Sequence, residues 1–74
     1  MSHSPVEAEV LSDLRDNGAD IPANIAARIE RHPRSISRSI RHLKEKELVR
    51  DKGAKVPVYE LTEQGVEAAV DIDG

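Results

Sequence analysis

The sequence predicts a mainly α-helical domain with one small β-hairpin (α+β), in the order helix, helix, helix, strand, strand, helix. Three segments before residue 47 repeat apolar residues at helical spacing, and a glycine at position 53 separates two short stretches typical of strands. A last helical pattern follows a threonine that can cap it. Because 74 residues suffice for one small domain, we expect a single domain over 1–74, with its core at about 5–70 and a frayed tail at 71–74.

The first helix is predicted at residues 5–16. Ser4 can cap it, Pro5 suits the first turn, and Glu7 completes a capping box. Its apolar residues recur at helical spacing: Val6, Val10, Leu11 and Leu14. The helix ends at Asn17-Gly18, because glycine readily adopts the left-handed conformation that closes a helix.

Two prolines delimit the second and third helices. Asp20-Ile21-Pro22 begins the second helix, and His32-Pro33 ends it near Arg31, since proline disfavours helical geometry in the residue before it. Pro33 suits the first turn of the third helix, which is predicted to run to about Lys46. The inward-facing residues are Ile25, Ala26 and Ile29 on the second helix and Ile36, Ile40 and Leu43 on the third.

A hairpin and a short helix complete the chain. Strands are predicted at 48–51 and 56–61, joined by a turn at Gly53, and Pro57 requires the second strand to lie at an edge, because proline cannot donate a ladder hydrogen bond. Thr62 can cap the last helix, at about 63–70. We expect Val66, Ala69 and Val70 to face inward.

Charge is distributed in three blocks along the chain. The net charge is −4 over residues 1–27, +6 over residues 28–55 and −5 over residues 56–74, although the whole chain carries only −3. The positive middle block coincides with the third helix and the hairpin. Local fields decide which partner docks where, so this block indicates an anionic partner.

The order of elements is that of a winged helix, and four segments carry a resemblance to a known family. These are 25–29, which looks like the first helix of a helix-turn-helix, 34–43, like its recognition helix, 43–49, like the exit "L-x-E-K-G-L-V", and 58–65, like the return "Y-x-L-T-x-x-G". The chain resembles the small winged helix-turn-helix regulators of bacteria and archaea over roughly residues 21–65. It is similar to the archaeal set that resembles the haloarchaeal phage phi-H repressor, with MarR-type regulators as wider kin.

Two positions depart from the family pattern. Family members usually carry glycine where Glu47 stands, and often Gly-Val where Glu30-Arg31 stand. Both turns around the predicted recognition helix must therefore close without glycine.

The third helix is the predicted reading element for double-stranded DNA, because an α-helix fits the B-DNA major groove and the N-terminal half of such a helix reads bases. Arg34 and Arg38 can each offer a bidentate fork to guanine, and Ser35 and Ser37 can reach a base edge or a phosphate. The remaining outward or flanking residues of this helix are Arg41 and His42.

The predicted wing, hairpin 48–61, carries Arg50, Lys52 and Lys55, which we expect either to contact phosphate or only to keep the hairpin soluble. The resemblance implies that the wing lies along the DNA backbone or enters the minor groove. For Arg28 and Arg31 on the second helix, two roles are equally expected. They contact phosphate, or they pair with acidic neighbours, of which Glu30, Glu45 and Glu47 are the candidates.

Several classes of function are disfavoured. The chain has no cysteine, and its three histidines are not spaced as metal ligands, so we expect no metal site and no cofactor. We find no catalytic constellation and expect neither enzyme activity nor a small-molecule ligand. Tyr59 is the only aromatic residue, which argues against binding by base stacking. No apolar run could cross a membrane and the N-terminus lacks the pattern of a signal peptide, so we expect a cytoplasmic protein.

The leading hypothesis is a sequence-specific DNA-binding regulator of the repressor type. We expect a homodimer, because one small module contacts few base pairs, with the first helix and the C-terminal segment as the dimer surface. The alternatives are a protein-interaction module of a larger complex and a binder of structured RNA. The narrow major groove of A-form RNA disfavours the latter.

Overall fold

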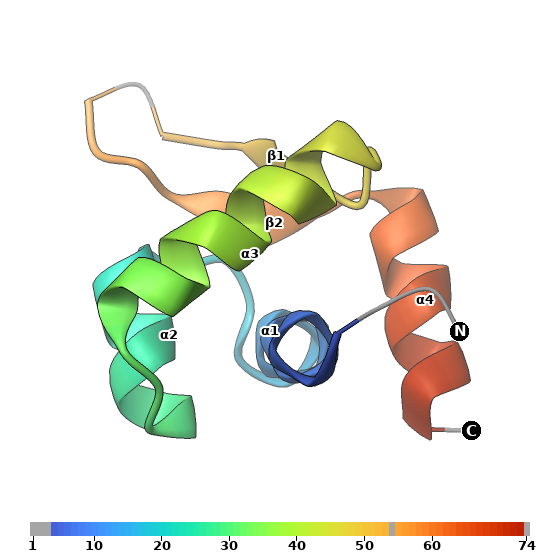
Figure 1. Ribbon diagram of the computed structural model, residues 1–74. Helices are drawn as coiled ribbons and strands as arrows, with labels where there is room; N and C mark the ends of the chain where they lie inside the picture. The colour runs from blue at the N-terminus through green and yellow to red at the C-terminus, as the bar shows by residue number, and fades with distance from the viewer. Residues whose placement is uncertain (1–3, 54, 74) are drawn as a thin grey trace.

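The computed structural model describes residues 4–53 and 55–73, and Figure 1 shows how their elements are arranged. The ends of the predicted domain, 1–3 and 74, and the turn residue Ala54 lie outside the described residues. The described elements are α1 (Pro5–Asn17), α2 (Pro22–Ile29), α3 (Pro33–Glu45), β1 (Val49–Asp51), β2 (Tyr59–Leu61) and α4 (Glu63–Asp73). The predicted α+β class and winged-helix order are confirmed.

Helix α1 begins and ends with the signals that its sequence carries. The Ser4 hydroxyl accepts a hydrogen bond from the backbone N–H of Glu7 at 3.2 Å, and Pro5 occupies the first turn. Gly18 has φ 82°, and its N–H donates to the carbonyl of Leu14 at 2.9 Å. A free N–H and a free carbonyl are thus satisfied at the two ends.

The turns on either side of α3 close through glutamates in the left-handed conformation. Helix α2 ends at Ile29, two residues before its predicted end, because Glu30 adopts φ 56° and ψ 49°. Glu47 adopts φ 63° after α3, and the N–H of Leu48 donates to the carbonyl of Leu43 at 2.9 Å. A residue with a Cβ atom in this conformation costs about 1–2 kcal/mol, so both turns are strained.

Helix α3 lies across α1 and α2, as Figure 1 shows, and packs against both. His32 caps it, with Nδ1 accepting the N–H of Arg34 at 3.0 Å. The predicted inward residues Ile36, Ile40 and Leu43 are almost fully buried, at 0–2% exposure. The orientation of the whole helix is therefore fixed by one apolar edge.

Strands β1 and β2 pair antiparallel, and Asp51 lies opposite Tyr59. The second strand begins at Tyr59 and not at residue 56, so Pro57 lies outside it and the predicted edge strand was too long. The other edge of β2 is also occupied, because Asp20 exchanges two backbone hydrogen bonds with Tyr59, at 3.1 and 3.0 Å. The segment between α1 and α2 thus extends the sheet by one residue.

Helix α4 continues to Asp73, so the predicted frayed tail is wrong for residues 71–73. Thr62 caps the helix as predicted, and its Oγ1 accepts the N–H of Gly65 at 3.0 Å. A Cβ atom on Gly65 would lie 2.0 Å from the carbonyl oxygen of Leu48. Glycine is therefore required at this contact.

Of the three residues of α4 predicted to face inward, only Ala69 is buried. Val66 is 46% exposed and Val70 is 54% exposed. Helix α4 approaches the domain closely along the side that carries Gly65 and Ala69, so small residues face the core and both valines face away from it. The prediction was wrong for these valines because helical spacing does not show which side of a helix lies closest to its neighbours.

The hydrophobic core lies between α1, α2, α3 and the start of the hairpin. Its buried members are Val10, Leu11, Leu14, Ile25, Ala26, Ile36, Ile40, Leu43, Leu48, Val49 and Ala69. Val6, Ile29, Tyr59, Leu61 and Ala68 pack against it while remaining partly exposed. A core this small leaves little excess stability, so individual strained or ionic contacts matter.

The strain in the left-handed turns gives a first prediction. Glu47→Gly should raise the free energy of unfolding by about 0.5–1 kcal/mol, because relief of the Cβ clash exceeds the added flexibility of the unfolded chain. Urea denaturation at neutral pH measures the change. The matched control is Glu67→Gly in the exposed middle of α4, which makes the same change of charge and should lower stability by about 1 kcal/mol. A loss of stability in both variants contradicts the assignment of strain to Glu47.

Candidate nucleic-acid interface

The outward side of α3 carries a stripe of three arginines. Arg34, Arg38 and Arg41 follow one another at intervals of four and three residues, which places them along one line of the helix. All three are exposed, as are Ser35 and Ser37 beside them. The stripe faces outward because the opposite side of α3 is held in the core.

The three arginines have no intramolecular ion-pair partner among residues 4–53 and 55–73. By contrast, Arg28 pairs with Asp13 and Asp20, Arg31 with Glu9, and Arg50 with Glu60. Cations that are already paired cost more to transfer to a phosphate, because an existing hydrogen bond must be broken. The exposed stripe is thus the part of α3 with positive charge available to a partner.

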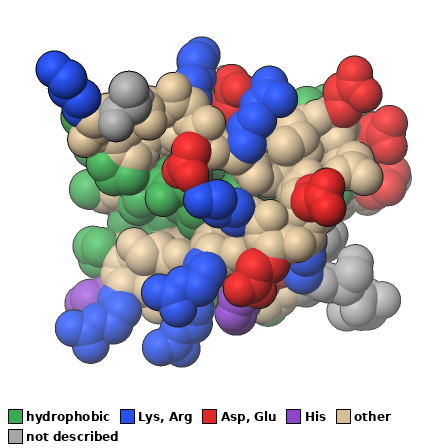
Figure 2. Space-filling view, turned by 90° about the horizontal axis from the view of Figure 1, so that it is seen from above, with side chains coloured by type: hydrophobic (Ala, Val, Ile, Leu, Met, Phe, Trp, Pro, Cys, Tyr) green, Lys and Arg blue, Asp and Glu red, His purple; other side chains and the backbone are tan. Residues whose placement is uncertain are grey.

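Figure 2 shows the face formed by α3 and the hairpin. Lys and Arg side chains gather toward the left end of this view, whereas most of its Asp and Glu side chains lie toward the right end. Apolar side chains are exposed between the basic groups. This face therefore has a positive end and a negative end, which would orient it on a polyanion.

A shallow groove of about 300 Å³ separates α3 from the hairpin. It is lined by Ser37, Ile40, Arg41, Lys44 and Tyr59. The Lys44 ammonium pairs with Asp51 of β1, which holds the pKa of Lys44 above its usual range. Sequence reasoning placed Arg41 and Ser37 correctly on the outward face but missed Lys44, which the spacing of three and seven residues from them indicates.

The predicted wing residues differ in their partners. Arg50 Nε lies 2.8 Å from a carboxylate oxygen of Glu60, and Lys52 Nζ lies 3.7 Å from its other oxygen. The hydrogen bond from Arg50 lowers the pKa of Glu60. Lys55 is exposed and has no carboxylate partner within the part of the chain that the structure describes. Lys55 is therefore the basic residue of the wing that is best placed to meet a phosphate.

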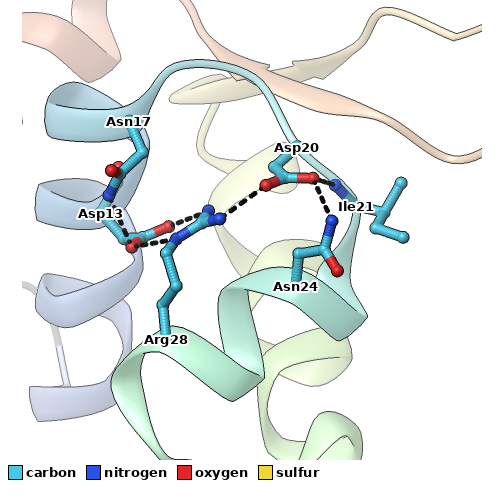
Figure 3. A network of polar contacts seen from close by, with 6 residues as sticks. All are labelled: Asp13, Asn17, Asp20, Ile21, Asn24 and Arg28. Atoms are coloured by element: carbon cyan, nitrogen blue, oxygen red, sulfur yellow. Dashed lines mark hydrogen bonds and ion pairs between the residues drawn. The ribbon is translucent and has the colours of Figure 1, made fainter.

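Arg28 lies between two aspartates of other segments, and Figure 3 shows how it reaches both. Its Nε and Nη2 donate to the two oxygens of Asp13 at 2.9 and 2.7 Å, and its Nη1 donates to Asp20 at 2.7 Å. These hydrogen bonds raise the pKa of Arg28 and lower that of Asp20. Arg31 makes a similar two-pronged contact with Glu9, at 2.9 and 3.0 Å.

Of the two readings of Arg28 and Arg31, the structure therefore places both in ion pairs. The acidic partners differ from the three candidates Glu30, Glu45 and Glu47 that lie near them or near α3 in the sequence. They lie on α1 or just before α2, at separations of 15, 8 and 22 residues. The sequence carries no signal for pairs that only the packing of α1 against α2 brings together.

His42 and Lys46 lie on the flank of α3 that faces α1, and both contact the buried carboxylate of Glu7. Lys46 Nζ lies 2.8 Å from one oxygen of Glu7, and His42 Nδ1 lies 3.5 Å from the other. Burial raises the pKa of Glu7, but the hydrogen bonds and charges of Lys46 and His42 lower it by more, so it lies below the ordinary 4.5. Ser39 is also buried on this flank. It was not among the residues predicted to face inward, although its spacing of three and four residues from Ile36 and Leu43 places it on the same side of the helix.

Neither a cluster of metal-binding side chains nor a membrane-spanning helix is found among the described residues. No three side chains of His, Cys, Asp or Glu within them lie where they could hold a metal ion. None of the described helices has both the length and the apolar character needed to cross a membrane.

Comparison with known proteins gives a family match and several similar structures. The model of the winged helix DNA-binding domain family matches residues 4–65. A comparison with curated proteins returns no match.

Three solved structures represent the similar folds. ZitR of Lactococcus lactis in complex with DNA is 21% identical with TM-score 0.86, covering 99% of this chain and 52% of its own. MepR, described as a transcription regulator of the Staphylococcus aureus multidrug efflux pump MepA, is 17% identical with TM-score 0.87, covering 97% and 56%. The Zalpha domain of Carassius auratus PKZ in complex with Z-DNA is 28% identical with TM-score 0.72, covering 77% and 92%. The present chain thus spans about half the length of the ZitR and MepR chains.

The contact of Glu7 with α3 predicts a pH-dependent contribution to stability. Because its pKa is lowered on folding, the contribution is complete above about pH 4.5 and is lost as the pH falls through the lowered value. Glu7→Gln should reduce the free energy of unfolding by about 1–2 kcal/mol at pH 7, and the difference from the wild type should disappear near about pH 2–3. Urea denaturation at both pH values measures this.

Glu67→Gln is the matched control, since Glu67 is exposed on α4 and forms no ion pair with any described residue. It should differ little from the wild type at either pH. If Glu7→Gln and Glu67→Gln show the same pH dependence, Glu7 does not anchor α3.

Proposed function

Because the chain belongs to the family of winged helix DNA-binding domains, we propose that it binds double-stranded DNA sequence-specifically and acts as a transcriptional regulator of the repressor type. Helix α3 would enter the major groove and the hairpin between β1 and β2 would act as the wing. The observation that carries this proposal is the exposed stripe Arg34, Arg38 and Arg41, whose positive charge has no carboxylate partner among the described residues. ZitR in complex with DNA and the transcription regulator MepR support it through their similar folds.

The geometry suggests a division of roles within the interface. Arg34 and Arg38 lie in the first half of α3 and would read guanine edges, with Ser35 and Ser37 contacting base edges or phosphates. Arg41 and Lys44 line the groove between α3 and the hairpin and would contact the sugar-phosphate backbone of the DNA there.

Outside α3, the carboxylate contacts of each basic residue decide its expected role. Lys55 would contact phosphate in every sequence, and Arg50 and Lys52 would do so less strongly because both are held by Glu60. Arg28 and Arg31 would contribute through the fold, since both guanidinium groups are held by carboxylates. His42 would contribute through its contact with α1.

The proposal includes a homodimer. Val66 and Val70 lie one turn apart and leave an apolar patch exposed on α4, at 46% and 54% exposure, and Ile72 is 37% exposed on another side of the same helix. Ile72 also lines a hollow of about 440 Å³ beside α1 and Ile29 of α2. This surface carries acidic groups and lies away from the stripe on α3, so a second copy could bind there while α3 meets DNA.

The proposal extends to the cellular setting. We place the protein in the cytoplasm, acting by binding and without catalysis, since its family and the similar structures are DNA-binding regulators. The resemblance to the archaeal set favours an archaeal source.

A second candidate is recognition of left-handed duplex DNA. The similarity to the Zalpha domain covers 92% of that domain, which was solved in complex with Z-DNA. Both candidates use α3 and the hairpin, so the form of the duplex decides between them.

Fluorescence anisotropy with four probes tests the proposed function. The probes are a right-handed DNA duplex pool, a left-handed alternating CG duplex, double-stranded RNA and single-stranded DNA, all at matched low salt. The proposal expects tightest binding to right-handed DNA, and a selection of bound sequences should yield a palindrome. Binding to none of the four would leave the protein-interaction module as the function, and preference for RNA or left-handed DNA would replace the leading candidate.

Substitutions in α3 and in the wing should act differently. Arg38→Ala should cost about 1–3 kcal/mol on the selected site and relax the preference for one base pair, because a bidentate contact to guanine is lost. Lys55→Ala should weaken selected and random duplexes by a similar factor, as expected of a phosphate contact. Titrations of both variants on both duplexes measure this. An equal loss for Arg38→Ala on the two duplexes would assign Arg38 to the backbone.

Val70→Glu should shift the protein from dimer to monomer in sedimentation velocity, because the new carboxylate would be buried in an apolar contact. Val56→Glu is a matched control, since Val56 is equally exposed, at 53%, but lies in the hairpin. A dimer that survives Val70→Glu, or one that both substitutions disrupt, would exclude α4 as the specific dimer surface.

A further inference from the structure

We propose that Arg28 and Asp20 form a positioning device that holds the wing in register with α3, so that both can contact one DNA duplex. This inference rests on the proposed function and adds two residues that act without touching DNA. It assigns a role to the network in Figure 3, which lies outside the exposed stripe of α3.

The first half of the device ties Arg28 to two segments at once. Two of its nitrogens bond the two oxygens of Asp13, whose side chain is only 5% exposed, and a third bonds Asp20. The pairing with Asp13 is bidentate, which fixes the plane of the guanidinium group. Its position in turn fixes where the carboxylate of Asp20 can lie.

The second half ties Asp20 to the hairpin. Its Oδ1 accepts the N–H of Ile21 at 2.7 Å and the amide of Asn24 at 2.9 Å, so the side chain holds its own backbone in an extended turn. That backbone exchanges two hydrogen bonds with Tyr59 of β2. The carboxylate thus shapes the segment against which β2 pairs.

The network connects the two parts of the interface by a short path. Arg28 lies in the last turn of α2, and α3 begins at Pro33 after the strained turn at Glu30. On the other side, Tyr59 lies opposite Asp51 and lines the groove between α3 and the hairpin. A change at Asp20 would therefore alter the wing while leaving the core contacts of α3 intact.

A direct ion pair between α3 and the hairpin, Lys44 with Asp51, is weaker than this network. Lys44 and Asp51 are about half exposed, at 52% and 46%, and such surface pairs contribute about 0–1 kcal/mol. The Arg28 network is less exposed and makes six hydrogen bonds through the side chains of Asp13 and Asp20. It is the better candidate for holding the wing in place.

The choice of variant separates positioning from simple loss of stability. Removing Arg28 would leave Asp13 buried without its cation, and the domain would be destabilised whatever the role of the network. Asp20→Asn preserves the contact between Arg28 and Asp13 and keeps an Oδ1 that can accept from Ile21 and Asn24. It replaces the oxygen that accepts from Arg28 with an amide donor, so it breaks the link between Arg28 and the segment that pairs with β2. It also removes one negative charge, which by itself favours binding to DNA.

The experiment compares Asp20→Asn with Asp71→Asn, which makes the same change of charge on exposed α4. Anisotropy titrations use the full chain and the selected duplex, at a temperature where both variants are folded by circular dichroism. Positioning predicts that Asp20→Asn weakens binding by roughly tenfold despite its favourable charge, whereas Asp71→Asn binds as the wild type or slightly tighter. Lys55→Ala should then add little further loss to Asp20→Asn, because the wing is already displaced.

Amide hydrogen exchange without DNA supplies an independent measurement. The N–H of Tyr59 donates to the carbonyl of Asp20 at 3.0 Å, so its exchange should accelerate at least about tenfold in Asp20→Asn, with the core amides of α3 unchanged. If the wild type binds DNA but Asp20→Asn binds with unchanged affinity, the inference is wrong and the proposed function stands. The same holds if the losses from Asp20→Asn and Lys55→Ala are fully additive. Absence of wild-type binding would overturn the proposed function, and unchanged exchange at Tyr59 would still reject the link between Asp20 and the wing.

Discussion

The structure depends on the coupling between the two sides of α3. Ile36, Ile40 and Leu43 are locked in the core by contacts with α1 and α2. Helical geometry then leaves no freedom for the residues between them, so Arg34, Arg38 and Arg41 must face solvent in one line. A rotation of α3 that turned the arginines inward would expose three large apolar side chains, at about 1.5–3 kcal/mol each. The same burial that folds the domain thus builds its interface.

Ion pairs divide the cations of this chain into two groups. Arg28, Arg31, Lys44, Lys46 and Arg50 are each held by a carboxylate from another element or strand. These pairs link α1 to α2, α1 to the end of α3, α3 to the hairpin, and β1 to β2. The stripe on α3 and Lys55 stay outside these pairs. Acidic residues on α1 and around β2 therefore neutralise structural cations and leave the charge of the interface unopposed.

Sequence patterns predicted most of the fold and the outward exposure of the arginines on α3, for a local reason. Caps, prolines and helical spacing act over four or fewer residues, so Ser4, Pro33, Thr62 and the inward side of α3 were placed correctly. The wrong predictions concern contacts between distant segments. The valines of α4 face outward because Gly65 and Ala69 approach the core, and Arg28 finds its partners across 15 and 8 residues. Neither fact is encoded in a local pattern.

The two turns beside α3 carry glutamate at positions 30 and 47, where glycine would be free of backbone strain. Both glutamates adopt the left-handed conformation that glycine would adopt without strain. Both turns therefore close without glycine at these positions. Backbone hydrogen bonds from Arg31 and Leu48 to the preceding helices hold this conformation in place.

Arg34, Arg38 and Arg41 form no ion pair with any other described residue, and this also bears on how such a protein can evolve. Side chains that the fold does not use can be exchanged without loss of stability, within the limits of helix propensity. Lineages could therefore acquire new target sequences by drift at these few positions while the core, the caps and the ion pairs remain the same. Under the proposed function, a change of target at these positions would leave the capacity of the domain to fold almost unaffected.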